Sequence, residues 1–339
     1  MMNPKRETKV SALRVGTIWL ILLAILAVSA VIAINVGTAK YPIGKIVRAL
    51  FSKEKSTVRI IVVKLRLPRL ILACLIGASL SAAGAILQSV MRNPLADPGT
   101  IGVSAGAGTA ATTILLLFPH LTGSIPLFAF GGAALACFLI YSMAWKGGVD
   151  PVRIILSGVA VNSVLGSYNA LLQMMHSDSL EGVLAFMNGS LSGRNWTHVR
   201  LCAIYAGIGL FLSFLCIKGA NILQLGDEMA KSLGINVSRT RVLLSAVSAF
   251  LAAATVSVAG MIGFVGLVVP HIARILVGSD YKQLLPTSVL LGADVLLVAD
   301  TIGRTVVPGM EIPVGIVMSV LGGPFFLYML RKKGRVSGH

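Results

Sequence analysis

The feature that most constrains this chain is a succession of apolar tracts, several of them long enough to cross a lipid bilayer. Of its 339 residues, 56% are hydrophobic and only 12% are charged, whereas soluble domains average roughly 25% charged residues. A helix needs about 20 apolar residues to span the hydrocarbon core. We therefore predict an all-α polytopic membrane protein with one transmembrane domain over residues 1–339.

Ten spans are expected, and one long tract has to be divided between two of them. The tract 241–278 would be roughly 57 Å long as one straight helix, which is nearly twice the roughly 30 Å hydrocarbon core. It must fold back, and Gly260, Gly263, Gly266 and Pro270 are the positions where it can turn. The expected spans are 15–36, 67–90, 99–118, 126–145, 153–175, 198–217, 241–262, 263–277, 284–303 and 312–330.

The distribution of charge sets the expected topology. The net charge of +17 lies between and beside the spans, where membrane lipid and loop partners are expected and nucleic acid is not. The first apolar tract is too long for a signal-peptide core, so it is interpreted as an uncleaved span of a cell-membrane protein. The tails 1–14 and 331–339 are then both cytoplasmic, and the basic loop 37–66 lies outside, where an acidic partner would explain it.

A weak internal repeat indicates an inverted architecture. A shift of 176 residues aligns Ala78–Gly102 with Ala254–Gly278 without gaps, and Pro94 then coincides with Pro270. The alignment pairs spans two to five with spans seven to ten. Because five spans separate equivalent points, the two copies have opposite orientations, as in many transporters. Stretches rich in small residues, such as 77–84, serve either close helix packing or the lining of a wide path.

The sequence carries no pattern typical of an enzyme. It contains no GxxxxGK phosphate loop, its five histidines are scattered, and its four cysteines lie in apolar tracts without C-x-x-C spacing. We predict no catalytic residue, no bound metal and no cofactor. Asp294 and Asp300 in the ninth span are candidates for the relay of an ion-coupled carrier. However, Asp300 and Arg304 are spaced i, i+4, which a helix-surface ion pair explains more simply.

The segment LQLGDEMAKSLGINVSRTR, residues 223–241, separates two apolar spans with a charged, helix-like stretch. Gly226 breaks the chain, and Asp227 and Glu228 then occupy a first helical turn, where acidic side chains interact favourably with the helix dipole. Gly234 can end this short helix.

The same segment predicts a second helix and an apolar face. Ser238 can cap the helix that continues into the seventh span. Leu225, Met229 and Leu233 recur every four residues and therefore lie on one side of the short helix. That side meets either the lipid interface or a partner protein.

Seven stretches, in order along the chain, resemble the FecCD/BtuC-type permease family. Its members are the membrane subunits of ABC importers for iron–siderophore complexes, haem and cobalamin. The resemblance implies a BtuC-like fold with ten spans, a second identical or homologous permease, two separate ATPase subunits and an extracytoplasmic binding protein. The stretches are LRLPR (65–69), NPLADPGTIGVSAGAG (93–108), NGSLSGRNW (188–196), LQLGDEMAKSLG (223–234), GFVGLVVPHIAR (263–274), ADTIGR (299–304) and EIPVGIVMSVLGGPFF (311–326).

The resemblance also implies roles for individual residues. At the outer surface, Arg66, Arg69 and Arg304 would pair with glutamates of the binding protein. The NPLADPG turn and the GGVDPVR loop would narrow the inner end of the path, through Asn93, Leu95, Pro151 and Val152. The cytoplasmic loop 218–240 would carry the coupling helix that enters a groove on the ATPase, through Leu225, Gly226, Asp227, Glu228, Met229, Ala230, Leu233 and Gly234.

The sequence therefore predicts a permease subunit of an ABC importer, with an iron(III)–siderophore as its cargo and no ATP hydrolysis of its own. Haem and cobalamin are alternative cargoes for the same machinery. An ion-coupled secondary transporter is the alternative from another class, and it would need no ATPase partner.

Overall fold

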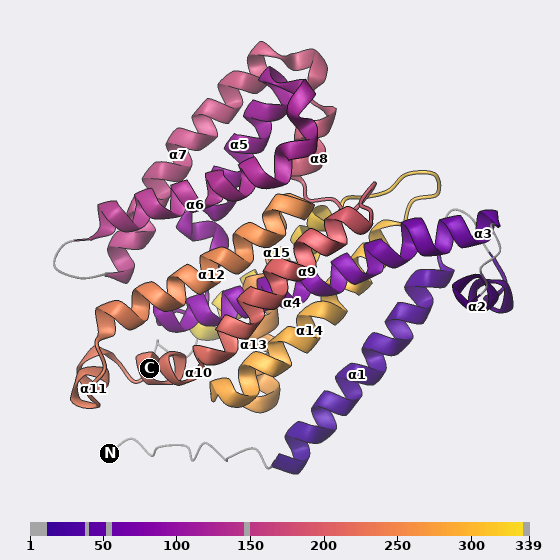
Figure 1. Cartoon of the computed structure of the whole chain (residues 1–339). Coiled ribbons are helices and arrows are strands. Elements are labelled where there is room, and N and C mark those ends of the chain that lie inside the picture. The colour runs from indigo at the N-terminus through magenta and orange to yellow at the C-terminus, as the bar shows by residue number, and fades with distance from the viewer. Residues whose placement is uncertain (1–11, 38–40, 52–55, 146–149, 335–339) are drawn as a thin grey trace.

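The described part of the chain is a bundle of helices. The computed structural model describes residues 12–37, 41–51, 56–145 and 150–334, and the elements in these ranges are all helical (Figure 1). The ten long helices are α1 (Ala12–Asn35), α4 (Leu67–Val90), α5 (Val103–Leu117), α6 (Ile125–Ala144), α7 (Pro151–Met175), α9 (Trp196–Leu215), α12 (Val237–Ala259), α13 (Val265–Val277), α14 (Tyr281–Gly303) and α15 (Val314–Gly334).

Short helices connect the long ones. The α-helical connections are α2 (Ile43–Phe51), α3 (Thr57–Arg59), α8 (Glu181–Met187), α10 (Ile217–Gln224) and α11 (Asp227–Ser232). The remaining ones are the π-helix η1 (Ile60–Arg66) and the 3₁₀ turns η2 (Pro98–Ile101), η3 (Pro119–Ser124) and η4 (Ser177–Ser179). In Figure 1, α10 and α11 lie at one end of the bundle, and α2 and α3 lie at the other.

The ten long helices coincide with the ten predicted spans. Seven candidate spans in the described ranges have the length and apolar composition needed to cross a membrane. The other three, α5, α13 and the first sixteen residues of α15, are shorter apolar helices. The prediction of an all-α polytopic membrane protein is confirmed. α15 extends to Gly334 and α1 begins at Ala12, so the inner parts of both expected tails are helical, while 1–11 and 335–339 lie outside the described residues.

The long tract 241–278 turns at two of the four predicted positions, Gly260 and Gly263. α12 ends at Ala259, and the chain turns through 260–264 before α13 begins. Gly260 has a φ of +76°, and a Cβ at this position would overlap the carbonyl of Phe186, so the turn requires glycine here. Gly266 and Pro270 lie inside α13, and they are not the turn.

α4 forms the centre of the bundle, and its small residues allow this. It packs against α9, α12, α13 and α14, and every residue from Ile76 to Val90 is buried. A Cβ at Gly84 would overlap the backbone of Gly266, and a Cβ at Gly77 would overlap the carbonyl of Gly292. The small residues of 77–84 therefore serve close helix packing, which decides between the two uses left open by the sequence.

Replacing Gly84 by alanine is expected to destabilise the protein by about 1–3 kcal/mol, because an extra methyl group in a packed core forces the backbones apart. The matched control is Gly207→Ala in α9, where a Cβ would meet no atom within 4 Å. Alanine there should be neutral or stabilising by up to about 1 kcal/mol, because it favours the helix. Thermal unfolding of the two variants in detergent measures the difference, and equal melting temperatures would contradict the close approach of α4 and α13.

The inverted repeat is visible in the packing of the helices. Three pairs of contacts correspond between the two halves. The α4–α14 contact corresponds to α12–α6, the α5–α6 contact to α13–α14, and the α5–α7 contact to α13–α15. Exchanging spans two to five with spans seven to ten therefore exchanges equivalent contacts. α4 and α12 are in contact and run in opposite directions (Figure 1). The gap-free register of the sequence alignment is wrong, because Pro94 lies in a turn after α4 whereas Pro270 lies inside α13.

Candidate functional sites at the two ends of the bundle

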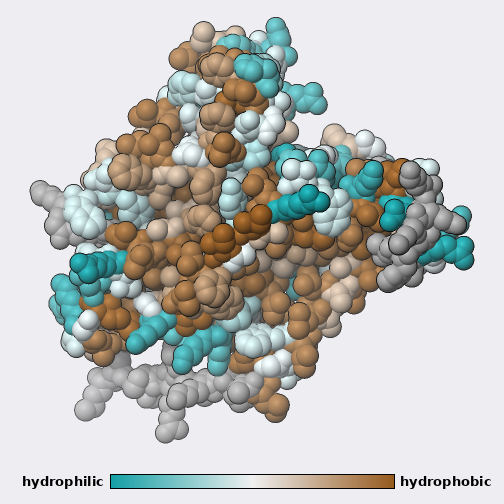
Figure 2. All heavy atoms as spheres, in the orientation of Figure 1, coloured by the Kyte–Doolittle hydropathy of each residue, from teal (hydrophilic) through white to brown (hydrophobic). Residues whose placement is uncertain are grey.

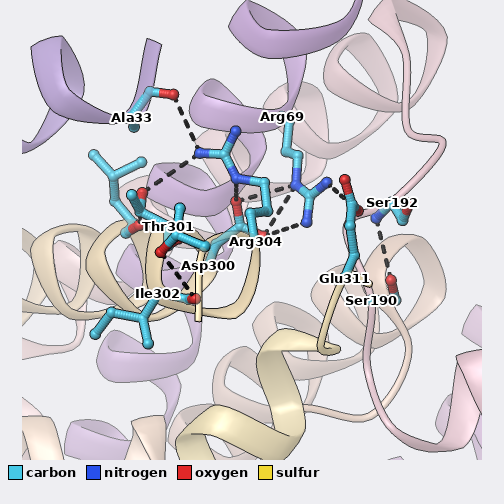
Figure 3. A network of polar contacts seen from close by, with 11 residues as sticks. Ala33, Arg69, Ser190, Ser192, Asp300, Thr301, Ile302, Arg304 and Glu311 are labelled. Atoms are coloured by element: carbon cyan, nitrogen blue, oxygen red, sulfur yellow. Dashed lines mark hydrogen bonds and ion pairs between the residues drawn. The ribbon is translucent and has the colours of Figure 1, made fainter. Parts of the chain in front are cut away.

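A cluster of arginines and acids joins α4 to the end of α14 (Figure 3). Arg69 donates hydrogen bonds from Nε and Nη2 to Asp300 Oδ1, at 3.0 and 2.9 Å, and from Nη1 to Glu311 Oε2 at 2.7 Å. Arg304 Nε lies 3.3 Å from Asp300 Oδ2. Asp300 therefore lies between two guanidinium groups, and Glu311 holds the outer side of Arg69.

The cluster is buried, which corrects the expectation of a helix-surface ion pair. The exposed fraction of the side chain is 1% for Asp300, 8% for Arg304 and 11% for Arg69. The i, i+4 spacing correctly pairs Asp300 with Arg304, but α4 covers the pair because its glycines let it approach α14 closely. Charges buried in this way need charge-assisted partners on every side, and Arg69 supplies the second one.

Arg66 contacts the end of α1. Its Nη1 donates to the carbonyls of Ile34 and Asn35, at 2.5 and 3.2 Å, and its guanidinium lies 6.0 Å from the ring centroid of Tyr41. Arg304 Nη2 donates to the carbonyl of Ala33 at 3.2 Å. The last carbonyls of a helix lack intrahelical donors, so these two arginines satisfy the end of α1.

The three arginines expected at the docking surface thus come together, but all of them bind groups of their own chain. A cavity of about 210 Å³ remains between them, lined by Gly37, Ile61, Leu65, Arg66, Arg69, Arg304 and Glu311. Three arginines face two acids in and around this cavity, which leaves an excess of one positive charge. No sequence signal marked Asp300 and Glu311 as partners of Arg69, because they lie more than 230 residues away along the chain.

Glu311 makes the stability of the cluster depend on pH. Burial raises the pKa of the Glu311 carboxyl, but the hydrogen bond and positive charge of Arg69 lower it by a larger amount. The pKa of Glu311 therefore lies below the ordinary value of 4.5. A depressed pKa contributes stability that is present above the unfolded value and is lost as the pH falls through the folded value. We expect wild type to melt above Glu311→Gln at neutral pH, and this difference to vanish as the pH falls below 4.5.

A control separates this effect from general acid unfolding. Glu228→Gln removes an exposed carboxylate at the other end of the bundle, and its melting temperature should follow that of wild type at every pH. A difference between wild type and Glu311→Gln that stays constant through the acid range would contradict the Arg69–Glu311 ion pair.

The polar segment 223–241 forms the predicted elbow at the opposite end of the bundle. Gly226 (φ +102°) precedes α11, Gly234 (φ +78°) follows it, and Asp227 and Glu228 occupy its first turn, as expected. The cap of α12 differs from the prediction. Asn236, and not Ser238, accepts the hydrogen bond from the Arg239 backbone, at 3.0 Å, because the chain becomes extended at Asn236 and Ser238 is already helical.

Asp227 joins the elbow to the rest of the bundle. Its Oδ1 accepts a hydrogen bond from Arg241 Nη2 at 2.8 Å, and Arg92 Nη1 lies 3.8 Å away. The side chain of Arg241 is only 4% exposed, so it depends on this acid, and Arg92 belongs to the turn after α4. The favourable dipole position that the sequence indicated for Asp227 is thus only part of its role.

The apolar stripe of the elbow is exposed. Leu225, Met229 and Leu233 are 59%, 54% and 56% exposed, whereas Ala230 on the other side of α11 is fully buried. Among the described residues, nothing covers the stripe. Such a row of apolar side chains at helical spacing is the surface by which an amphipathic helix enters a groove.

One helix connects the elbow with the arginine cluster. Asn221 of α10 donates from Nδ2 to Asp280 Oδ1 at 2.8 Å, and its Oδ1 accepts a hydrogen bond from the backbone of Tyr281 at 2.9 Å. Asp280 also caps α14, and Asp300 lies near the other end of that helix. Sequence reasoning missed this connection, because a contact between residues 221 and 280 leaves no local pattern.

The residues expected to form the inner gate lie in a turn before η2 and at the start of α7. Asn93 Oδ1 accepts a hydrogen bond from the Leu95 backbone at 3.0 Å, which makes a tight turn before η2. Pro151 opens α7 and Val152 is 61% exposed. η2, which follows the first loop, packs against α7. Residues 146–149 of the second loop lie outside the described residues, and the gating role stays a prediction.

Known proteins resemble this chain over nearly its whole length. The Fe(3+)-citrate import system permease protein YfmE of Bacillus subtilis (strain 168) is 42% identical over 317 residues, covering 93% of this chain and 95% of that protein. The iron(3+)-hydroxamate import system permease protein FhuG of the same strain is 40% identical, covering 89% and 92%. The cobalamin import system permease protein BtuC of Halobacterium salinarum (strain ATCC 700922 / JCM 11081 / NRC-1) is 40% identical, covering 82% and 75%.

The fold and a family model agree with these relatives. A solved ABC transporter in an inward-facing conformation superposes with a TM-score of 0.81 at 28% identity, covering 94% of this chain and 99% of that one. The model of the FecCD transport family matches residues 25–332. Ten helices in a BtuC-like arrangement are what the resemblance of the sequence stretches implied. This chain therefore belongs to the FecCD transport family and is a permease of the ABC importer type.

Proposed function

We propose that this chain forms the membrane path for an iron(III)–siderophore, which an extracytoplasmic binding protein delivers and a separate ATPase subunit drives inward. The observation that carries the proposal is the presence of two distinct surfaces at opposite ends of the bundle. One is the positively charged arginine cavity, the other is the exposed stripe of the elbow, and α14 connects the two. A transport subunit of this kind needs no catalytic group of its own.

The arginine cavity supports docking of an acidic partner. Because the three arginines outnumber Asp300 and Glu311, a further carboxylate entering the cavity finds a favourable potential. Glu311 is 40% exposed, so an incoming glutamate can compete with it for Arg69. Charge pairs at the rim of an interface set its register and speed its formation more than they tighten it.

The cargo is proposed from the relatives. Two of them are named for Fe(3+)-citrate and for iron(3+)-hydroxamate, which favours an iron chelate. The cobalamin permease among the relatives keeps cobalamin as a second candidate cargo. The ion-driven carrier loses one of its two candidate relay groups, because Asp300 is held by Arg69 and Arg304. The other, Asp294, is buried in α14, and its carboxylate oxygens have no hydrogen-bond partner among the described residues.

Uptake into proteoliposomes tests this function. The chain is reconstituted with its ATPase and binding protein, and radiolabelled ferric citrate, a ferric hydroxamate and cobalamin are offered with and without ATP. We expect ATP-dependent uptake of a ferric chelate that a protonophore does not affect. ATP-dependent uptake of cobalamin alone would overturn the cargo, and ATP-independent uptake that a protonophore abolishes would overturn the whole assignment.

A further inference from the structure

A groove runs along the face of the bundle formed by α6, α9 and α12. Both α6 and α9 pack against α12, but along their described lengths they do not pack closely against each other. A cavity of about 690 Å³ opens between α6 and α9, and one of about 500 Å³ lies between α6 and α12. Phe130 lines both cavities, so the two are neighbours.

Aromatic rings lie where the two cavities meet. They belong to Phe130, Tyr205 and Phe250, which are stacked or edge-on with ring centroids 5.6–6.2 Å apart.

The inner cavity is apolar and shaped by small side chains. Ala246, Ala249 and Ala253 form one stripe of α12 and face Ala134 of α6 across the hollow. Large apolar side chains surround the groove, for example Leu127 and Phe138, which are each 69% exposed. Brown predominates over this face in Figure 2. A wall of this kind in a membrane-crossing bundle is filled by hydrocarbon more favourably than by water.

The outer cavity has a polar end with an uncompensated cation. Arg194 lines it, and its Nε is buried without a hydrogen-bond partner. None of the ion pairs among the described residues includes Arg194. Burial lowers the pKa of the Arg194 guanidinium and no acid raises it, yet an arginine remains charged at neutral pH. The hydroxyls of Thr122, Ser124 and Thr197 line the same end.

We propose that this groove is a binding site for one phospholipid, whose phosphate pairs with Arg194 and whose acyl chain lies between α6 and α12. A guanidinium offers two parallel donors to a phosphate, and the hydroxyl groups beside it suit a glycerol head group. Trp196 lies two residues after Arg194, and tryptophan is enriched at the membrane–water interface. The site thus combines a charged end at head-group level with an apolar wall below it.

The dimensions of a lipid leaflet fit the groove. Half of the hydrocarbon core is roughly 15 Å thick. Phe130 lies five residues into α6, a rise of roughly 8 Å, so an acyl chain anchored at Arg194 is long enough to reach the aromatic rings and the inner cavity beside them. The proposal concerns the outer flank of the bundle, and it stands whether or not the cargo assignment holds.

Lipid retention tests the proposal. The purified full-length chain is equilibrated with palmitoyl-oleoyl phosphatidylglycerol, and retained lipid is counted by native mass spectrometry. Wild type should retain one molecule, and Arg194→Gln should retain about tenfold less, since a hydrogen bond to a charged group is lost. Arg194→Lys should retain an intermediate amount. The matched control Arg200→Gln removes an exposed charge of α9 that does not line the cavity, and retention should not change.

A second variant tests the acyl chain independently. Ala249→Phe fills the inner cavity and should reduce retention of the palmitoyl-oleoyl lipid while sparing a lauroyl lipid, whereas Leu243→Phe, which lies outside the cavity, should do neither. Equal retention in Arg194→Gln and Arg200→Gln would overturn the proposal, and so would displacement of the lipid by inorganic phosphate. A further outcome would assign the groove to a second copy of the chain: two Leu127→Cys copies form a disulfide cross-link, and wild type retains no lipid.

Discussion

Replacing Met229 by glutamate is expected to reduce ATP-driven uptake at least about tenfold, because truncating or charging a central anchor of an interface costs about 2 kcal/mol or more. Met229 is the middle member of the exposed stripe of the elbow, between Leu225 and Leu233. A carboxylate there would have to be desolvated on entering an apolar groove of the ATPase. The variant should also lose the ATPase during co-purification.

The fold should survive this change, which makes the test specific. Met229 is 54% exposed and its side chain holds no element in place, so the melting temperature of the isolated permease should stay within about 1 °C of wild type. Met229→Leu keeps the apolar surface and should restore uptake. Lys231→Gln is the matched control on the same helix, because it changes an exposed charge outside the stripe, and it should transport normally.

Charge reversal at Asp227 is a weaker test of coupling. Asp227 binds the buried Arg241 and lies beside Arg92, so a lysine there would disrupt the elbow itself and abolish transport for a structural reason. If Met229→Glu retains both full uptake and the ATPase, the stripe contacts lipid and the coupling assignment is wrong.

Replacing Asp300 by asparagine is expected to lower the stability of the permease by about 3–5 kcal/mol, the usual effect of removing one partner of a buried ion pair. The amide keeps the shape of the side chain but leaves Arg69 and Arg304, both about nine-tenths buried, without their shared anion. α4 and α14 should separate at this end, and binding-protein-dependent uptake should fall with the loss of the cavity. Thermal unfolding and uptake are the two measurements.

Two further variants isolate the cause. Asp280→Asn removes a carboxylate at the other end of the same helix, where it is an exposed cap, and it should cost no more than about 1 kcal/mol. Combining Asp300→Asn with Arg304→Met removes one of the stranded cations and should recover part of the lost stability. If Asp300→Asn melts like Asp280→Asn, the anion is not the centre of the cluster.

Local patterns were enough to predict the elements of this fold and the surfaces at its two ends. The apolar tracts predicted the ten long helices, the glycines of 260–266 predicted a turn inside the long tract, and the four-residue spacing of Leu225, Met229 and Leu233 predicted one exposed face. These features depend on neighbours within a few residues, and hydrophobic periodicity and capping preferences report such neighbours directly.

The partners of the charged residues could not be predicted in the same way. Arg66 and Arg69 were expected to pair with glutamates of a binding protein. Their partners within the chain were not predicted: Arg66 binds the end of α1, and Arg69 pairs with Asp300 and Glu311. The repeat was real in the packing but was aligned in the wrong register. In each case the decisive contact joins residues that are distant along the chain. Neither local sequence patterns nor matching residues in a shifted alignment reveal such a contact.

By itself, the sequence determined that this chain crosses the membrane as ten helices and carries a polar elbow between the sixth and the seventh, because chain segments of this length and hydropathy have no other stable arrangement in a bilayer. Only the tertiary structure decided which arginines are occupied, how α14 joins the elbow to the arginine cluster, and where a groove stays open between α6 and α9. These depend on how closely helices approach one another, and that distance is set by glycines and buried charges on different helices meeting in space.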